Sequence, residues 1–245
     1  MLARDELRWV PWLPLLLAEG LYARVATARL PAARDPRGRT GPGAALRLAG
    51  LGDSIIAGIG VERQADGLVG QVAARIAART GLPVEWHAIG AAGADSRTVA
   101  AALLAQALAC EPQCVVLSVG VNDAVAGTAP DAFKDRLAVI VDALATSRAR
   151  PAVVFGGIPP LDRFPALPWP LSRLLGDRSR ALQAAAVTLT GYRGLKVVNF
   201  PDRLDPRGFA ADGFHPAAAA CATWAEWVMH GLVLALEDLG PAQRR

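Results

Sequence analysis

The chain has 245 residues, of which 53% are hydrophobic and 20% are charged, so it can bury a large core and is not intrinsically disordered. Its formal net charge is +4, but the basic residues are spread along the chain, which argues against a nucleic-acid partner. Its three cysteines show no CxxC spacing, which argues against a disulfide framework or a zinc knuckle.

The N-terminal segment predicts an amphipathic helix followed by a linker. The apolar residues that fall on one face of this helix are Trp9, Trp12, Leu13, Leu16, Leu17 and Leu21. The apolar centre is too short to span a bilayer, so the helix either packs on the protein or contacts a membrane surface through residues 9–21. A weak cleavable signal peptide is the third alternative. The sequence favours a cytoplasmic location and leaves membrane association and secretion open.

Residues 31–43 are rich in proline, glycine and arginine and predict a linker. Residues 1–43 therefore form the expected N-terminal helix and linker, and residues 44–245 form one domain. Within this domain, predicted strands and helices alternate. The strands are expected at residues 45–52, 83–90, 114–120, 152–158 and 196–200. The helices, which have apolar residues at helical spacing, are expected at residues 67–80, 96–109, 131–147, 171–190 and 216–239.

This alternation defines the expected fold class. Repeated strand–helix units make consecutive strands parallel and place helices on both faces of the sheet. The sequence therefore predicts an α/β protein with three α/β/α layers and a five-stranded parallel sheet.

Polar residues follow the carboxyl ends of these strands, which is where ligands bind in such folds. Ser54 follows the first strand, Gly93 the second and Asn122 the third, while Asp212 and His215 follow the fifth. An acyl-transfer site needs a nucleophile, a base, a group that orients the base and donors for an oxyanion. The residues expected at this rim can supply all four.

Four short blocks contain these residues, and they read GDSI, GAAGAD, GVND and DGFHP. Their order and their placement after predicted strands, over roughly residues 46–237, resemble the SGNH hydrolases, also called the GDSL esterase/lipase family. The resemblance implies the flavodoxin-like SGNH hydrolase fold and a serine esterase. It implies that Ser54 attacks an ester carbonyl, His215 takes the proton and Asp212 orients the imidazole. The backbone N–H groups of Ser54 and Gly93 and the side-chain amide of Asn122 would form the oxyanion hole.

Each of these residues also has an ordinary structural interpretation. Ser54 and Asn122 could be turn residues, and Asp212 could only cap a helix. Gly93 could be an ordinary turn residue, and Gly90 is the other glycine in the same block. A non-catalytic binding module on the same fold is therefore an alternative to the enzyme.

The acidic neighbours of the nucleophile and the amide are expected to be structural: Asp53 as a brace for loop amides, and Asp123 as a cap or loop brace. No sequence motif indicates a metal or a cofactor. Ile55 stands where a dinucleotide-binding turn has its third glycine, and GK[ST] and HExxH are absent. We expect a site that needs neither.

Residues 159–176 follow the fourth strand and combine apolar side chains with prolines. Phe164, Leu167 and Trp169 are the candidate substrate-binding residues, because an apolar wall over Ser54 would receive an acyl chain or an aryl group. The alternative is that these side chains pack on the core. The expected substrate is a small-molecule ester with a short-to-medium acyl or aryl group. A carbohydrate O-acetylesterase and a lysophospholipase are alternatives on the same fold.

Overall fold

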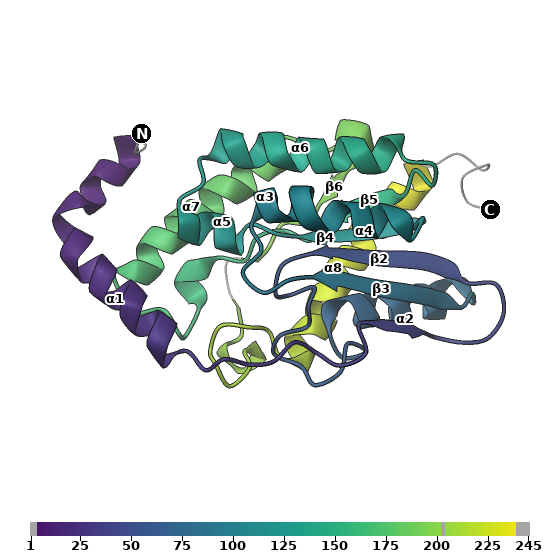
Figure 1. The fold of residues 1–245 in the computed structure, drawn as a ribbon, viewed down its shortest axis with the longest axis horizontal. Coiled ribbons are helices and arrows are strands. Elements are labelled where there is room, and N and C mark those ends of the chain that lie inside the picture. The colour runs from purple at the N-terminus through teal and green to yellow at the C-terminus, as the bar shows by residue number, and fades with distance from the viewer. Residues whose placement is uncertain (1–3, 202–203, 239–245) are drawn as a thin grey trace.

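The computed structural model describes residues 4–201 and 204–238 and consists of a central sheet with helices on both faces (Figure 1). The strands are β1 (Arg37–Arg39), β2 (Leu46–Gly52), β3 (Val84–Gly90), β4 (Cys114–Ser118), β5 (Ala152–Phe155) and β6 (Lys196–Val197). The longer α-helices are α1 (Leu13–Ala26), α2 (Leu68–Thr80), α6 (Pro130–Thr146), α7 (Leu171–Val187) and α8 (Ala218–Asp238).

Several helical elements are short. The short α-helices are α3 (Ser96–Thr98), α4 (Leu104–Ala109) and α5 (Val121–Ala126). A π-helical turn, η2 (Val99–Leu103), joins α3 to α4, so the helix expected at residues 96–109 is continuous but not regular. The 3₁₀ helices are η1 (Arg4–Trp12), η3 (Leu161–Arg163), η4 (Tyr192–Gly194) and η5 (Pro206–Gly208).

The described sheet has six strands in the order β1-β3-β2-β4-β5-β6. The five expected strands are all present, and they are parallel to one another. Numbered along the chain among themselves, they have the order 2-1-3-4-5 of a doubly wound flavodoxin-like sheet. The three-layer α/β/α fold class is thus confirmed, with one more strand than expected.

The additional strand, β1, comes from residues 31–43, which were expected to be a linker. It pairs antiparallel with β3, with Arg37 opposite His87 and Arg39 opposite Glu85. Without β1, β3 would be the edge strand of the sheet with unpaired backbone groups. Composition could not reveal this strand, because its formation depends on a partner strand about fifty residues away along the chain.

Side chains of the central strands alternate between the two faces of the sheet. On β2, Leu48 points into the layer that contains α2 and α8, whereas Ala49 and Leu51 point into the layer that contains α6 and α7. Every residue of β4 is buried, as expected for a strand covered on both sides. This two-sided core fixes the strands whose carboxyl ends form the site.

Candidate active site

The candidate site lies where the carboxyl ends of three adjacent strands meet. Gly52, at the end of β2, is opposite Gly90 of β3 and Ser118 of β4. The sheet order reverses at β2, so this is the topological switch point, where doubly wound folds bind their ligands. Ser54 follows β2 by two residues, and Asn122 lies on α5, just beyond the end of β4.

Ser54, His215 and Asp212 form a continuous chain of hydrogen bonds. The His215 Nε2 atom lies 3.0 Å from Ser54 Oγ, and His215 Nδ1 lies 2.6 Å from Asp212 Oδ2. A carboxylate accepts hydrogen bonds, so the imidazole places its Nδ1 proton toward Asp212 and leaves Nε2 to accept the Ser54 hydroxyl proton. The arrangement can therefore activate a serine nucleophile.

A tight loop before α8 holds the His–Asp pair. Phe209 and Pro216 form an isolated antiparallel bridge, and the Ala210 N–H donates to the carbonyl of His215 at 2.8 Å. Asp212 Oδ1 accepts from the backbone N–H groups of Phe214 and His215, both at 2.9 Å. One carboxylate thus organises both the loop backbone and the imidazole.

Three phenylalanines pack together at this loop: Phe209 and Phe214 belong to it, and Phe164 comes from the segment after β5. The Phe164 ring lies 5.1 Å from the ring of Phe209 and 5.1 Å from that of Phe214, in edge-to-face geometry. Phe214 in turn lies 5.3 Å from the imidazole of His215. Phe209 and Phe214 were not predicted from the sequence, although Phe214 lies inside the DGFHP block. The aromatic residue directly before the candidate base, Phe214, was the feature of the sequence that could have indicated this packing.

Two of the residues expected to bind an oxyanion, Gly93 and Asn122, follow the strands that flank β2. The Asn122 Nδ2 atom donates to the carbonyl of Ala94 at 2.9 Å, which uses one of its two hydrogens and leaves the second for another acceptor. Gly93, next to Ala94, has φ = +76°, a conformation that L side chains rarely adopt, although a Cβ there would meet nothing within 4 Å. Gly90 lies in β3, before this loop.

A buried ion-pair network clamps this loop to α5. Asp123 is fully buried and accepts from the backbone N–H of Ser96 at 2.8 Å and from its hydroxyl at 2.6 Å. Arg136 of α6 lies 3.6 Å from the same carboxylate. Because Asp123 follows Asn122 directly, this network fixes the amide of Asn122 relative to the loop that contains Gly93. Sequence spacing suggested a loop brace at Asp123, but gave no sign of its partners.

A second buried carboxyl group, that of Asp53, precedes the nucleophile. Burial raises the pKa of Asp53 to about 7, because water no longer stabilises the charged form. The hydrogen bond from the Ile55 N–H, 3.0 Å long, lowers this pKa in part, and the nearby Asp123 raises it. Asp53 therefore braces the loop as expected, and it does so as a group that titrates near neutral pH.

An apolar cavity of about 490 Å³ lies against residues that flank Ser54 and His215 in the chain. Ile55, which follows Ser54, lines it, as do Phe214 and Pro216 on either side of His215. Aromatic side chains form much of the remaining wall: Phe164, Phe200, Phe209, Trp224 and Trp227. The volume is within the range typical of small-molecule sites, about 300–1,000 Å³.

The three candidate substrate-binding residues have different surroundings. Phe164 is buried and lines the cavity. Leu167 packs against the core and is not part of the cavity wall. Trp169 is 66% exposed and contacts Trp12 of the N-terminal segment, with ring centroids 5.2 Å apart. The structure thus brings only Phe164 to the cavity.

Other reactive groups give no competing site in the described part of the chain. Burial raises the pKa of the Cys114 and Cys221 thiols to about 12, so neither is a ready nucleophile. Within residues 4–201 and 204–238, no group of three His, Cys, Asp or Glu side chains is placed to hold a metal ion.

Comparison with known proteins gives one family and a set of similar folds. The sequence model of the GDSL-like lipase/acylhydrolase family matches residues 51–222. No curated protein sequence matches the chain significantly. Among solved structures, a lipase from a goat rumen metagenome has a TM-score of 0.61 at 14% identity, covering 76% of this chain and 97% of its own.

Two further solved structures are similar. A lipase/acylhydrolase from Enterococcus faecalis has a TM-score of 0.59 at 22% identity and covers 76% of this chain and 94% of its own. A variant of an acetyl xylan esterase from Geobacillus stearothermophilus has a TM-score of 0.55 at 18% identity, with coverages of 78% and 95%. At such identities, the likeness shows the fold.

The raised pKa of Asp53 makes stability depend on pH. Between the ordinary aspartate pKa of 3.8 and about 7, the folded chain keeps a proton that the unfolded chain releases, so stability falls as pH rises. Relative to Asp53→Asn, the wild-type free energy of unfolding should fall by up to about 1.4 kcal/mol per pH unit between pH 5 and 7 and level off above pH 8. Urea denaturation of the wild type and of Asp53→Asn at several pH values between 5 and 8 measures this difference in the free energy of unfolding. A constant difference would mean that Asp53 is ionised throughout.

Removing the buried clamp should destabilise the fold. Asp123→Ala leaves the Ser96 N–H and the Arg136 guanidinium without their acceptor, and we expect a loss of about 2–3 kcal/mol in the free energy of unfolding. The matched control is Asp131→Ala on α6, since Asp131 pairs with Lys134 in solvent and should contribute little. Urea denaturation of the two variants tests the contrast, which is contradicted if both lose the same stability.

Proposed function

This chain belongs to the GDSL-like lipase/acylhydrolase family and is an ester hydrolase, and from this premise we propose that it cleaves esters with short-to-medium acyl or aryl groups through Ser54, His215 and Asp212. The observation that carries the proposal is the hydrogen-bonded chain of 3.0 Å and 2.6 Å from Ser54 through His215 to Asp212. Such a chain is the arrangement required for an activated serine.

Catalysis follows from this arrangement in two half-reactions. The Ser54 oxygen attacks the ester carbonyl while its proton moves to His215 Nε2, and Asp212 stabilises the imidazolium that forms. The tetrahedral intermediate collapses as His215 returns the proton to the departing alcohol, which leaves an acyl group on Ser54. A water molecule, deprotonated by His215, then attacks the acyl-enzyme, and collapse of the second intermediate restores Ser54 and releases the acid.

The negative charge of each tetrahedral intermediate needs hydrogen-bond donors. We assign this role to the N–H groups of Ser54 and Gly93 and to the second amide hydrogen of Asn122. The contact between Asn122 and Ala94 supports the assignment, because it keeps the amide beside the Gly93 loop in the absence of substrate. Such preorganised donors are worth about 2.7–4 kcal/mol each in transition-state stabilisation.

The apolar cavity supports the choice of substrate class. Its wall is largely aromatic and aliphatic, and it touches the chain on both sides of the catalytic residues. An acyl chain or aryl ring can be buried there, with a gain of about 0.8 kcal/mol for each methylene group. The main alternative substrate is an acetylated carbohydrate, because one protein with a similar fold is an acetyl xylan esterase. Most of the wall offers no hydrogen-bond partner to sugar hydroxyl groups, and Asp205, Arg207 and Thr223 are its polar members.

Replacement of the nucleophile tests the triad. Ser54→Ala should lower kcat for p-nitrophenyl butyrate by at least 10⁴-fold, because no other group in the triad can form the acyl-enzyme. The circular dichroism spectrum and the urea midpoint should stay close to those of the wild type. Turnover by the purified, folded variant within tenfold of the wild-type rate would show that Ser54 is not the nucleophile.

Filling the cavity should change the preference for acyl length. Ala219 of α8 is exposed and lines the cavity, so Ala219→Phe should exclude about two methylene groups and reduce kcat/KM for p-nitrophenyl octanoate about tenfold relative to the acetate. Ala218→Phe, one residue earlier and outside the wall, is the matched control. Equal losses for both esters, or faster turnover of acetylated xylose than of any simple ester, would count against the proposed substrate class.

A further inference from the structure

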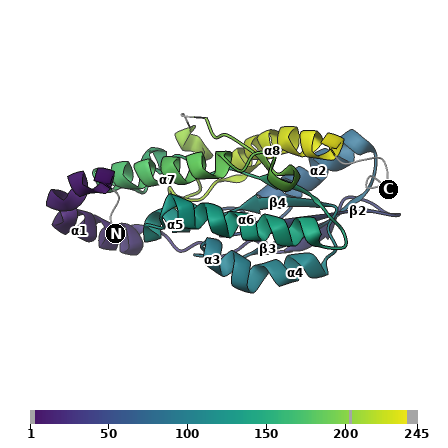
Figure 2. The same cartoon turned by 90° about the horizontal axis from the view of Figure 1, so that it is seen from above.

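A helical arm projects from one end of the molecule. It consists of η1 and α1, residues 4–26, and both ribbon views place it beyond the α/β body, next to α7 (Figures 1 and 2). The family match begins only at residue 51, so the arm lies outside the part shared with the family. The function of the catalytic residues does not account for it.

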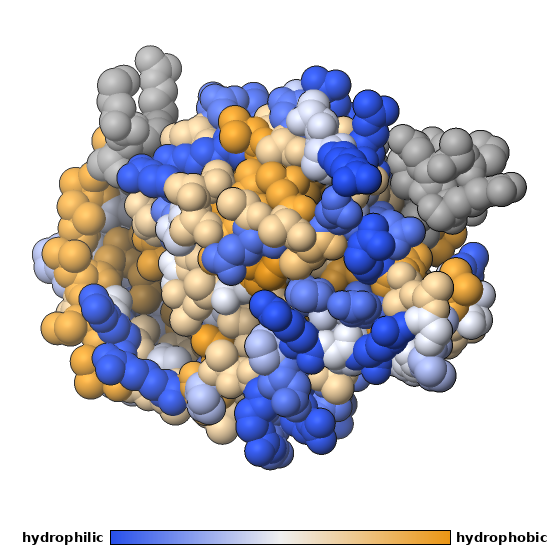
Figure 3. All heavy atoms as spheres, turned by 45° about the vertical axis from the view of Figure 1, so that its right-hand side comes forward, coloured by the Kyte–Doolittle hydropathy of each residue, from blue (hydrophilic) through white to orange (hydrophobic). Residues whose placement is uncertain are grey.

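The outer face of this arm is apolar. Leu13, Leu17, Leu21 and Val25 recur every four residues along one side of α1, and the last three are 72%, 65% and 77% exposed. The other exposed large apolar residues of the arm are Leu7, Val10, Trp12, Leu15 and Tyr22. In Figure 3, apolar surface runs down the left edge of the molecule, the side on which Figure 1 places α1. Contiguous exposed apolar surface of this kind marks an interaction site.

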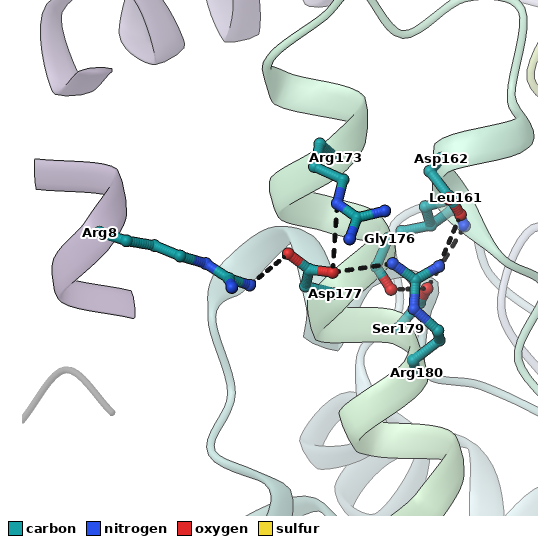
Figure 4. Close-up of polar contacts among 8 residues, drawn as sticks. All are labelled: Arg8, Leu161, Asp162, Arg173, Gly176, Asp177, Ser179 and Arg180. Carbon is teal, nitrogen blue, oxygen red and sulfur yellow. Dashed lines mark hydrogen bonds and ion pairs between the residues drawn. The ribbon is translucent and has the colours of Figure 1, made fainter. Parts of the chain in front are cut away.

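The inner side of the arm makes specific contacts with the body. Arg8 pairs with Asp177 of α7 at 2.7 Å, and Asp177 also contacts Arg173 and Arg180 (Figure 4). The Glu19 carboxylate accepts from the backbone N–H of Leu171 at 2.9 Å. Leu16 is the buried apolar residue of α1. The arm is therefore held in one orientation, with Leu16 turned inward and the apolar outer face in solvent.

Charge and aromatic residues indicate what covers the outer face. Arg24, in the last turn of α1, and Arg29, three residues beyond its end, are both exposed. Trp12 and Trp169 contact each other edge to face at the start of α1, and Tyr22 of α1 is 64% exposed. Tryptophan and tyrosine at the border of an apolar surface with adjacent arginines match the interface of a bilayer with anionic headgroups.

The dimensions of the arm exclude a membrane-spanning role for α1. A helix of 14 residues is about 21 Å long, shorter than the hydrocarbon core of about 30 Å, and no helix of the described residues is long and apolar enough to cross a membrane.

We propose that this arm docks the protein on the surface of a membrane rich in anionic phospholipid, with the apolar face of α1 inserted among the acyl chains and Arg24 and Arg29 at the headgroups. Trp169 belongs to the segment that leaves the carboxyl end of β5 and continues from Phe164, which lines the cavity. Docking therefore brings the catalytic rim toward the bilayer, where apolar esters partition. The proposal does not depend on the assigned triad.

Sedimentation with sucrose-loaded vesicles tests the docking. The full-length protein should bind vesicles of 70% phosphatidylcholine and 30% phosphatidylglycerol more tightly than pure phosphatidylcholine, and added salt should weaken the difference. Leu17→Ser/Leu21→Ser should lower the partition coefficient more than tenfold. Arg24→Gln/Arg29→Gln should lower it about fivefold for each arginine, on anionic vesicles only. Ser54→Ala should bind as the wild type does.

The matched control is Leu82→Ser/Val139→Ser, which removes two apolar side chains of similar exposure, 53% and 58%, from outside the arm. It should bind vesicles as the wild type does, and all arm variants should hydrolyse dissolved p-nitrophenyl butyrate at the wild-type rate. Absence of vesicle binding, or equal loss in the control, would overturn the proposal. A dimer would also overturn the proposal if vesicle binding is absent and light scattering shows that Leu17→Ser/Leu21→Ser converts this dimer to a monomer.

Discussion

The register of β2 with its two neighbours is the constraint on which the site depends. Because Gly52 lies opposite both Gly90 and Ser118, the three strands end at one level, and the loops that follow them begin side by side. The strands approach so closely that a Cβ on Gly52 would lie 1.8 Å from the carbonyl oxygen of Ser118. The nucleophile loop is thereby tied to β4, an attachment that the Asp53 N–H reinforces by donating to the same oxygen at 3.1 Å.

The two halves of the site are held by different parts of the structure. Sheet register and the buried Asp123–Ser96 contact fix the half that contains Ser54, Gly93 and Asn122. The loop that contains His215 is held by the hydrogen bonds of Asp212 and by the aromatic contacts of Phe164. The same Phe164 ring also lines the cavity, so this loop and the cavity share one contact.

One segment of the chain links the cavity to the arm. Phe209 and Phe214 of the loop that contains His215 line the cavity, and the segment after β5 leads from Phe164 to Trp169, where it meets the arm. If the proposed function holds, an apolar cavity and an apolar arm together favour esters that concentrate at interfaces. The ion pairs that hold the arm through Asp177 give its apolar face a fixed orientation relative to the site.

The sequence by itself determined the five parallel strands and the placement of Ser54, Asn122, Asp212 and His215 after them, because strand periodicity and turn residues are local properties of the chain. Tertiary structure alone decided which side chains meet. Residues 31–43 looked like a linker, yet β1 pairs with β3. The helix α5 has only six residues between two glycines, and local patterns do not predict it. Trp169 was expected in a wall of the site, yet it contacts Trp12 edge to face, about 160 residues earlier along the chain. Each of these outcomes depends on the packing of segments far apart along the chain, which no local pattern records.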